Sequence, residues 1–309
     1  MNIWFQWVCF SLFLLVMPSL AVGLIRKTKA RLQNRRGAPI YQPLIDLCKF
    51  FFKGETVSYL SSWIFRSSSC VQLACILLIA YLAPWSSLKP FCTGGDLFLI
   101  IYLFALIRLV TVLAALDTGS VFGGFGASRE VTLAVIVEPA IILCFVSLAA
   151  VSHTSDLGQV FSFSNQALHY DSPLWLTCGT GMFLASIVEL SRMPVDDPTT
   201  HLELTMVHEA MVLENSGRNL LLVEYGHSLK IIVLLGLAGQ CYLHSLPSMW
   251  TSSAAVQIIA SILCLLLLLF AIALIEATNV KLRWTKIPEF VAYSLVMSIV
   301  SVFIAIWRA

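Results

Sequence analysis

Residues 189–225 read ELSRMPVDDPTTHLELTMVHEAMVLENSGRNLLLVEY, the one long polar passage in the C-terminal two-thirds of the chain. The passage holds seven of the chain's 17 acidic residues. Apolar runs lie on both sides of it, and each has the roughly 20 mostly apolar residues that a membrane-spanning helix needs. The passage is therefore predicted to be a loop between two spanning helices, where its carboxylates serve a chemical role or meet a partner.

Working outward, the composition indicates a membrane protein, because 59% of the 309 residues are hydrophobic and only 12% are charged. Soluble domains usually have about 25% charged residues. We predict an all-α integral membrane protein, folded as a single polytopic membrane domain over residues 1–309. The eight predicted spanning helices cover about 2–24, 68–88, 95–116, 131–151, 173–191, 225–245, 252–275 and 289–307. The first is interpreted as a retained span rather than a signal peptide, because its basic residues follow the apolar run.

The distribution of lysine and arginine predicts the orientation. Of 19 such residues, 15 lie in the connecting segments 25–67, 117–130, 192–224 and 276–288. Basic loops stay on the cytoplasmic side. We therefore expect a multi-pass protein of the cell inner (plasma) membrane, with these long basic and acidic loops in the cytoplasm and both termini on the other side.

The first cytoplasmic segment begins with a basic run, followed by apolar residues between 44 and 52 that alternate with charged ones. This second part is typical of an amphipathic helix at the membrane surface. The basic run either sets the topology and contacts anionic lipid or docks a soluble protein. The candidate docking residues are Arg26, Lys27, Lys29, Arg31, Arg35 and Arg36.

Two ionisable residues fall deep inside predicted spans. Arg108 needs a carboxylate or a water-filled cavity, either as a structural pair or for charge movement. Glu138 is a functional candidate for the same reason, and Pro139 after it favours a local break in the helix. The glycine-rich segment 119–126 lacks a phosphate-binding pattern, so we expect a tightly packed loop there, with Arg129 and Glu130 opening the fourth span.

The acidic loop is expected to contain a short helix that is capped by Thr199 or Thr200 and continues through His208 and Met211. His208-Glu209 resembles the start of a zinc-protease motif, but Val212 stands where the second histidine belongs, so that pattern fails and no metal ligand is assigned. A metal site formed by His201 and His208 is the minor alternative. Glu209 by itself is expected on a solvated face of this helix. The nine cysteines are scattered without a CxxC pair, which favours free thiols.

Several short motifs together resemble one family. They are RLQNRRG (31–37), LDTGS (116–120), GASRE (126–130), VEP (137–139), Glu189 with RMPVD (192–196), EL (203–204) and ENSG (214–217). Over nearly the whole chain they are similar to the membrane anchor subunit of respiratory complex I and its relatives in group 4 energy-converting nickel–iron hydrogenases. The likeness is greatest to the membrane subunits of formate hydrogenlyase and hydrogenase 4.

The resemblance implies a subunit without a catalytic centre that anchors a soluble redox arm and links it to proton or sodium translocation through buried glutamates. Implied partners are a hydrogenase-like large subunit, a small iron–sulfur subunit, a ferredoxin-like subunit and antiporter-like membrane subunits, with no nucleic acid. Iron–sulfur clusters, and nickel–iron in a hydrogenase partner, would belong to those subunits. The proton-pathway candidates are Glu130, Glu138, Glu189, Asp196, Glu203 and Glu214, with charge partners Arg108, Arg129 and Arg192.

The acidic loop departs from the complex I pattern, which reads roughly PFDLPEAExEL. Val195 and Asp197 replace its phenylalanine and leucine, and Thr199 and His201 stand at two of its glutamates. These changes argue against a quinone chamber of the usual kind and favour a hydrogenase-type complex. Two other interpretations remain. One is a purely structural anchor, and the other is a stand-alone transporter, for which we find no internal repeat.

Overall fold

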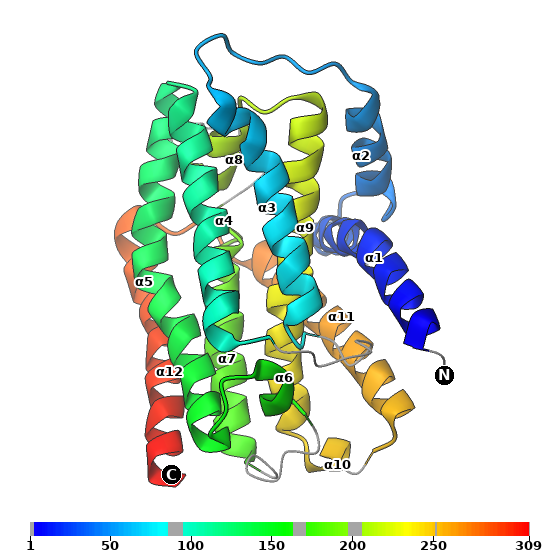
Figure 1. Cartoon of the computed structure of the whole chain (residues 1–309), viewed down its shortest axis with the longest axis vertical. Helices are drawn as coiled ribbons and strands as arrows, with labels where there is room; N and C mark the ends of the chain where they lie inside the picture. Colours follow the sequence, from blue (N-terminus) through cyan, green and yellow to red (C-terminus); the bar gives the residue numbers. More distant parts are fainter. Residues whose placement is uncertain (1–2, 86–94, 163–170, 197–205, 251, 309) are drawn as a thin grey trace.

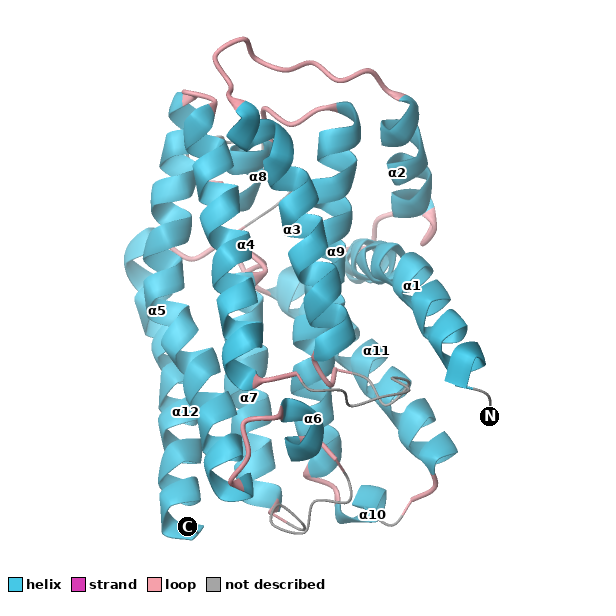
Figure 2. Ribbon diagram, in the orientation of Figure 1, coloured by secondary structure: helices cyan, strands magenta, loops and turns pink. Residues whose placement is uncertain are grey.

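The computed structural model describes residues 3–85, 95–162, 171–196, 206–250 and 252–308. Within these ranges the named elements are helices, most of which run side by side as an elongated bundle (Figures 1 and 2). They are α1 (Ile3–Leu32), α2 (Gln42–Phe52), α3 (Trp63–Leu82), α4 (Leu97–Asp117), α5 (Val121–Ser152), α6 (Leu157–Val160), α7 (Ser172–Glu189), α8 (His208–Val212), α9 (Gly217–His244), α10 (Pro247–Trp250), α11 (Ala254–Thr278), the 3-10 helix η2 (Trp284–Lys286) and α12 (Ile287–Arg308).

Among the described residues, seven helices are long and apolar enough to cross a membrane: α1, α3, α4, α5, α9, α11 and α12, the last together with η2. This confirms an all-α integral membrane protein. The remaining predicted span, the fifth at 173–191, corresponds to α7, which has 18 residues and contacts α5, α9 and α12. Most faces of α7 meet other helices, where small residues such as Gly179 and Gly181 permit close approach.

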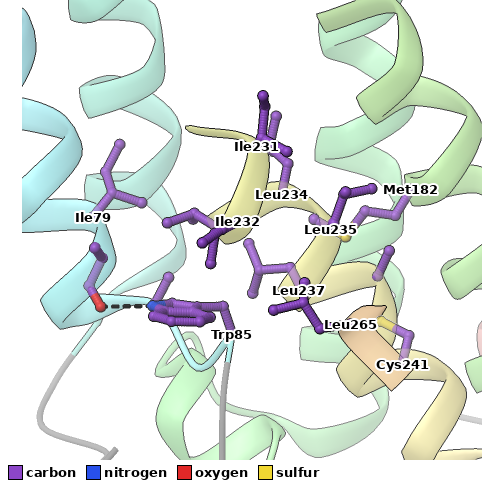
Figure 3. Packing of buried hydrophobic residues seen from close by; sticks show 14 of the residues in the cluster. Ile79, Trp85, Met182, Ile231, Ile232, Leu234, Leu235, Leu237, Cys241 and Leu265 are labelled. Carbon is purple, nitrogen blue, oxygen red and sulfur yellow. Dashed lines mark hydrogen bonds between the residues drawn. The ribbon is translucent and has the colours of Figure 1, made fainter. Parts of the chain in front are cut away.

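The centre of the bundle is α9, which contacts α1, α2, α3, α7 and α11. Its run from Ile231 to Leu235 is buried, and it packs against side chains from other helices, such as Ile79, Met182 and Leu265 (Figure 3). Trp85 closes this core beside α3 and donates its indole N–H to the Ala80 carbonyl at 2.8 Å. Because other helices cover most of α9, its polar side chains, such as Asn219 and Gln240, are buried inside the protein.

Several connections lie at opposite ends of the bundle. The segments α2–α3 and α4–α5 and the start of α9 lie at one end, whereas α6 and α10 lie at the other (Figure 1). A helix is present where the surface helix was predicted. It is α2, which has no buried residue and packs at the periphery of the bundle against α9 and α1.

Four helices differ from the predicted bounds by more than three residues. One is α3, which begins at Trp63 rather than at 68 and ends at Leu82 rather than at 88. α1 continues to Leu32, because its basic residues are good helix formers and are favourable at a helix C-terminus. α5 begins at Val121, so the glycine-rich segment is helical rather than a loop. α9 begins at Gly217, whose φ of 53° and close approach to the Gly54 carbonyl oxygen require glycine.

The expected break at Pro139 is absent, since α5 is continuous through that residue over its 32 residues. A helix of that length extends about 48 Å, more than the roughly 30 Å of a bilayer core. The helices α7 and α12 pack along α5, so the missing amide hydrogen bond is tolerated as in other membrane helices.

The glycines of α5 divide into crowded and open positions, which gives a matched test. A Cβ on Gly126 would lie 2.9 Å from the Val207 carbonyl oxygen, whereas Gly124 has no heavy atom within 4 Å. Gly126→Ala should destabilise the chain by about 1–3 kcal/mol through overpacking against α8. Gly124→Ala should stabilise it by roughly 0.5–1 kcal/mol. Thermal unfolding of both variants in mild detergent measures the difference, and equal stabilities would contradict this packing.

Candidate functional site

The interior holds an ion cluster where α4, α7 and α9 meet. Arg108 of α4 pairs with Glu189, the last residue of α7. Lys230 of α9 lies 2.8 Å from the other carboxylate oxygen of Glu189 and also donates to the Glu189 backbone carbonyl at 3.2 Å. All three side chains are at most 14% exposed. A buried carboxylate with two cationic partners meets the requirement that charges inside a protein be paired.

Two glutamates of α5 complete this cluster. Glu138 pairs with Arg108, and a Glu130 carboxylate oxygen lies 3.9 Å from Nε of the same arginine. The cluster therefore contains three carboxylates and two cations, so it has one more ionisable acid than base. Such an excess allows a proton to be held or released without leaving a cation unpaired.

Glu138 differs from the other members because its side chain is 41% exposed. Its neighbour Val135 is 68% exposed, which places this stretch of α5 on the outer surface of the bundle. A small cavity lined by Arg108, Glu138 and Glu189 connects the buried arginine with that surface. The ion cluster therefore opens sideways at Glu138.

A second group of ion pairs holds the start of the acidic loop. Arg192 lies 3.2 Å from Glu276 of α11, and Lys29 of α1 lies 3.5 Å from the same carboxylate. Asp196 pairs with Lys281 at 2.6 Å and accepts a hydrogen bond from the Val207 backbone N–H at 2.9 Å. The loop is thus tied to three distant parts of the chain.

The remaining predicted residues lie elsewhere. Arg129 donates to the Met206 carbonyl at 3.3 Å and stacks on Trp284, rather than joining the carboxylates. Glu214 is exposed beyond α8. Glu203 lies outside the described residues, as do Thr199, Thr200 and His201 of the expected loop helix. Within the described part of the loop, the helix is α8.

The candidate docking residues separate into two sets. Arg31, Arg35 and Arg36 are exposed at and beyond the end of α1. Lys29 reaches inward to Glu276, and Arg26 lines an internal cavity despite its exposure. Lys27 is half-buried. In the part of the chain that the structure describes, no group of three or more metal-ligating side chains occurs.

Sequence reasoning assigned no site role to four residues that line a cavity of about 190 Å³ between α1, α8 and α9: His208, Glu209, Glu224 and His227. The prediction of a solvated Glu209 is wrong, because its side chain is half-buried in the wall of this cavity. Burial and the Glu224 charge raise the pKa of Glu209 to about 7. The available signal was the spacing on α9, where Glu224 and His227 are three residues apart and share a helix face.

Glu209 makes stability depend on pH. Its pKa is higher in the folded chain than the ordinary 4.5, so the folded state binds more protons between about pH 4.5 and 7. Stability contributed by this group is therefore present at low pH and is lost as pH rises through 7. Glu209→Gln should raise the melting temperature at pH 8 relative to the unmodified chain and change it little at pH 5. Glu214→Gln, an exposed change on the same loop, is the control, and the same shift at both pH values would contradict the assignment.

Comparison with known proteins gives relatives along the whole chain. Hydrogenase-4 component C of Escherichia coli (strain K12) is 35% identical over 233 residues, which are 74% of this chain and 71% of that protein. Formate hydrogenlyase subunit 4 of the same organism is 29% identical over 283 residues, 90% of this chain and 91% of the relative. A chain in the structure of the membrane-bound sulfane sulfur reductase, an archaeal respiratory membrane complex, shares the fold with a TM-score of 0.78 at 19% identity, covering 99% of this chain and 100% of that one.

The family model described as NADH dehydrogenase matches residues 5–306. This match and the relatives agree with the motifs that carry the resemblance to the complex I membrane anchor, which run from the first cytoplasmic segment to the acidic loop. The chain therefore belongs to the NADH dehydrogenase family, as a membrane protein of the complex I anchor type.

Proposed function

We propose that this chain is the membrane subunit of a hydrogenase-like, multisubunit oxidoreductase complex and links redox chemistry in a soluble arm to proton translocation. The observation that carries the proposal is the ion cluster of Arg108, Lys230 and three glutamates, which opens to the outer surface of the bundle at Glu138. The names of the relatives, a hydrogenase-4 component and a formate hydrogenlyase subunit, support the type of complex.

The exposure of Glu138 favours a partner inside the membrane. A carboxylate in contact with lipid is costly, whereas one that faces a polar partner helix is paired or hydrated. We expect an antiporter-like membrane subunit to cover this part of α5 and to exchange the translocated proton with Glu138. Sodium is the alternative ion, because carboxylate oxygens also bind hard cations.

The redox arm is expected at the end of the bundle where α2, α8 and the acidic loop lie. We propose that the chain lies in the cell inner membrane. This end of the bundle would face the cytoplasm, because its connections carry the excess of lysine and arginine. The arm would comprise the large, small and ferredoxin-like subunits, and would hold the iron–sulfur clusters and any nickel–iron centre. A change of charge in the arm would alter the balance of the buried ion pairs through the loop that carries Arg192 and Asp196.

Replacing Glu138 tests the ion pathway. Glu138→Gln keeps the shape and hydrogen bonding of the side chain but removes its titration, so charge translocation by the assembled complex should fall at least tenfold. Assembly should be unchanged, as measured by co-purification of the partner subunits from membranes. Charge movement is followed with a potential-sensitive dye in inverted vesicles during redox turnover. Glu289→Gln, an exposed change on α12, is the control. If Glu138→Gln translocates charge normally, the ion pathway is wrong and the chain is a purely structural anchor.

A charge reversal tests the docking surface. Arg35→Glu with Arg36→Glu should release the soluble arm, because both side chains are exposed and their attraction to a partner becomes repulsion. Release is measured as loss of the arm's iron from the purified complex. The same double reversal at Arg283 and Lys286, which are also exposed, is the control. Full retention of the arm in the first variant would assign the basic run to lipid contact and topology alone.

A further inference from the structure

Three adjoining cavities connect the ion cluster with the groove beside α2. An inner cavity of about 50 Å³ is lined by Arg108, Glu130, Glu189 and Lys230. A middle cavity of about 190 Å³ is lined by Arg192, Glu209, Glu224 and Glu276. An outer cavity of about 230 Å³ is lined by Arg26, Glu209 and Glu224, together with residues of α2. Each cavity is large enough for a water molecule and has several charged side chains in its wall, which are the partners that buried water needs.

Shared residues show how the cavities adjoin. The middle and outer cavities have Arg26, Glu209 and Glu224 in common. The inner and middle cavities have Ser191, His208 and His227 in common. Two histidines therefore form part of the wall between the charged interior and the larger, more acidic space toward α2.

The two histidine rings are stacked, with centroids 4.3 Å apart and an angle of 25° between their planes. His208 begins α8, and His227 lies on α9, so the pair joins the acidic loop to the central helix. Two charged rings at this separation would repel each other, so the pair accepts at most one extra proton. Stacking occupies the faces of the rings, whereas proton transfer uses the nitrogens at their edges.

The surroundings suit transient rather than permanent protonation. Burial, with Lys230 and Arg192 near by, lowers the pKa of His208 to about 4. At neutral pH its imidazole is therefore uncharged, and such a ring accepts a proton at one nitrogen and donates from the other. Arg26 of α1 and Asp196 of the acidic loop also act on the charge of the pair. The carboxylates that share the two cavities with the histidines are Glu130 and Glu189 on the inner side and Glu209 and Glu224 on the other.

We propose that His208 and His227 form a proton relay between the ion cluster, at Glu130, and the carboxylates Glu209 and Glu224. A proton enters or leaves through the outer cavity, rests on Glu209 or Glu224, and passes through water and one imidazole to Glu130, because both oxygens of Glu189 are already paired with Arg108 and Lys230. Each transfer breaks one N–H or O–H bond as the next forms, so no co-reactant is needed. The relay rests on the proposed proton function, and it assigns roles to residues that are distinct from Glu138.

The test uses the assembled complex in inverted vesicles, with reduced methyl viologen as electron donor and a potential-sensitive dye as readout. His208→Gln with His227→Gln removes both titrating rings while keeping hydrogen-bonding side chains of similar size. We expect charge translocation to fall at least tenfold while the partner subunits still co-purify. His153→Asn, at an exposed left-handed position at the end of α5, is the control and should translocate charge normally.

Chemical rescue separates proton transfer from a structural role. His227→Ala removes an imidazole ring from the wall between the inner and middle cavities, and the space it leaves fits free imidazole. Added imidazole should restore at least a third of the lost translocation in His227→Ala and none in Glu138→Gln. The membrane potential is the suitable readout, because imidazole dissipates a pH gradient but not an electrical one.

The outcomes distinguish the relay from the proposed function. Normal translocation in the double glutamine variant overturns the relay, and so does a loss in His227→Ala that imidazole does not restore. If Glu138→Gln abolishes translocation while the histidine variants translocate normally, the proposed function stands and the relay alone is wrong. If Glu138→Gln translocates normally, the proposed function fails first.

Discussion

The ion pair between Arg108 and Glu189 is the constraint on which the interior depends. An arginine in the middle of an apolar helix loses its hydration, and removing one partner of a buried pair costs about 3–5 kcal/mol because the other charge is left alone. Glu189 is shared with Lys230, and Arg108 is shared with Glu130 and Glu138. These pairs fix α4, α5, α7 and α9 relative to one another, because moving any one of them would strand a charge.

The second set of ion pairs extends this polar interior to the loop. Glu276 joins Lys29 and Arg192, and Asp196 joins Lys281, so α1, α11 and the segment before α12 all hold the start of the acidic loop. The water-sized cavities lie between the two sets. A bundle whose helices are mostly apolar therefore contains a continuous polar layer, which begins beside α2 and ends sideways at Glu138.

Much of the candidate site is predictable from the sequence, and the failures have a common cause. Arg108, Glu138 and Glu189 stand out because ionisable groups are rare and costly within spans. The burial of His208 and Glu209 is not predictable, because a loop of mixed polarity looks the same whether or not it folds back into the protein. The glycines of α5 predict a loop because glycine has a low intrinsic helix propensity. Helix propensity contains no information on tertiary packing, and here α8 packs closely against Gly126.

The sequence by itself determined the class of protein and the few charges that need partners, because burial in lipid penalises polar groups at every position alike. Only the tertiary structure decided which carboxylate meets which cation. The physical reason is that α4 and α5 are apolar on nearly all sides, so their pattern does not specify which face turns inward. That rotation, set by the packing of α4 against α3 and of α5 against α7 and α12, brought Glu130 and Glu138 to Arg108 and left Arg129 on Trp284.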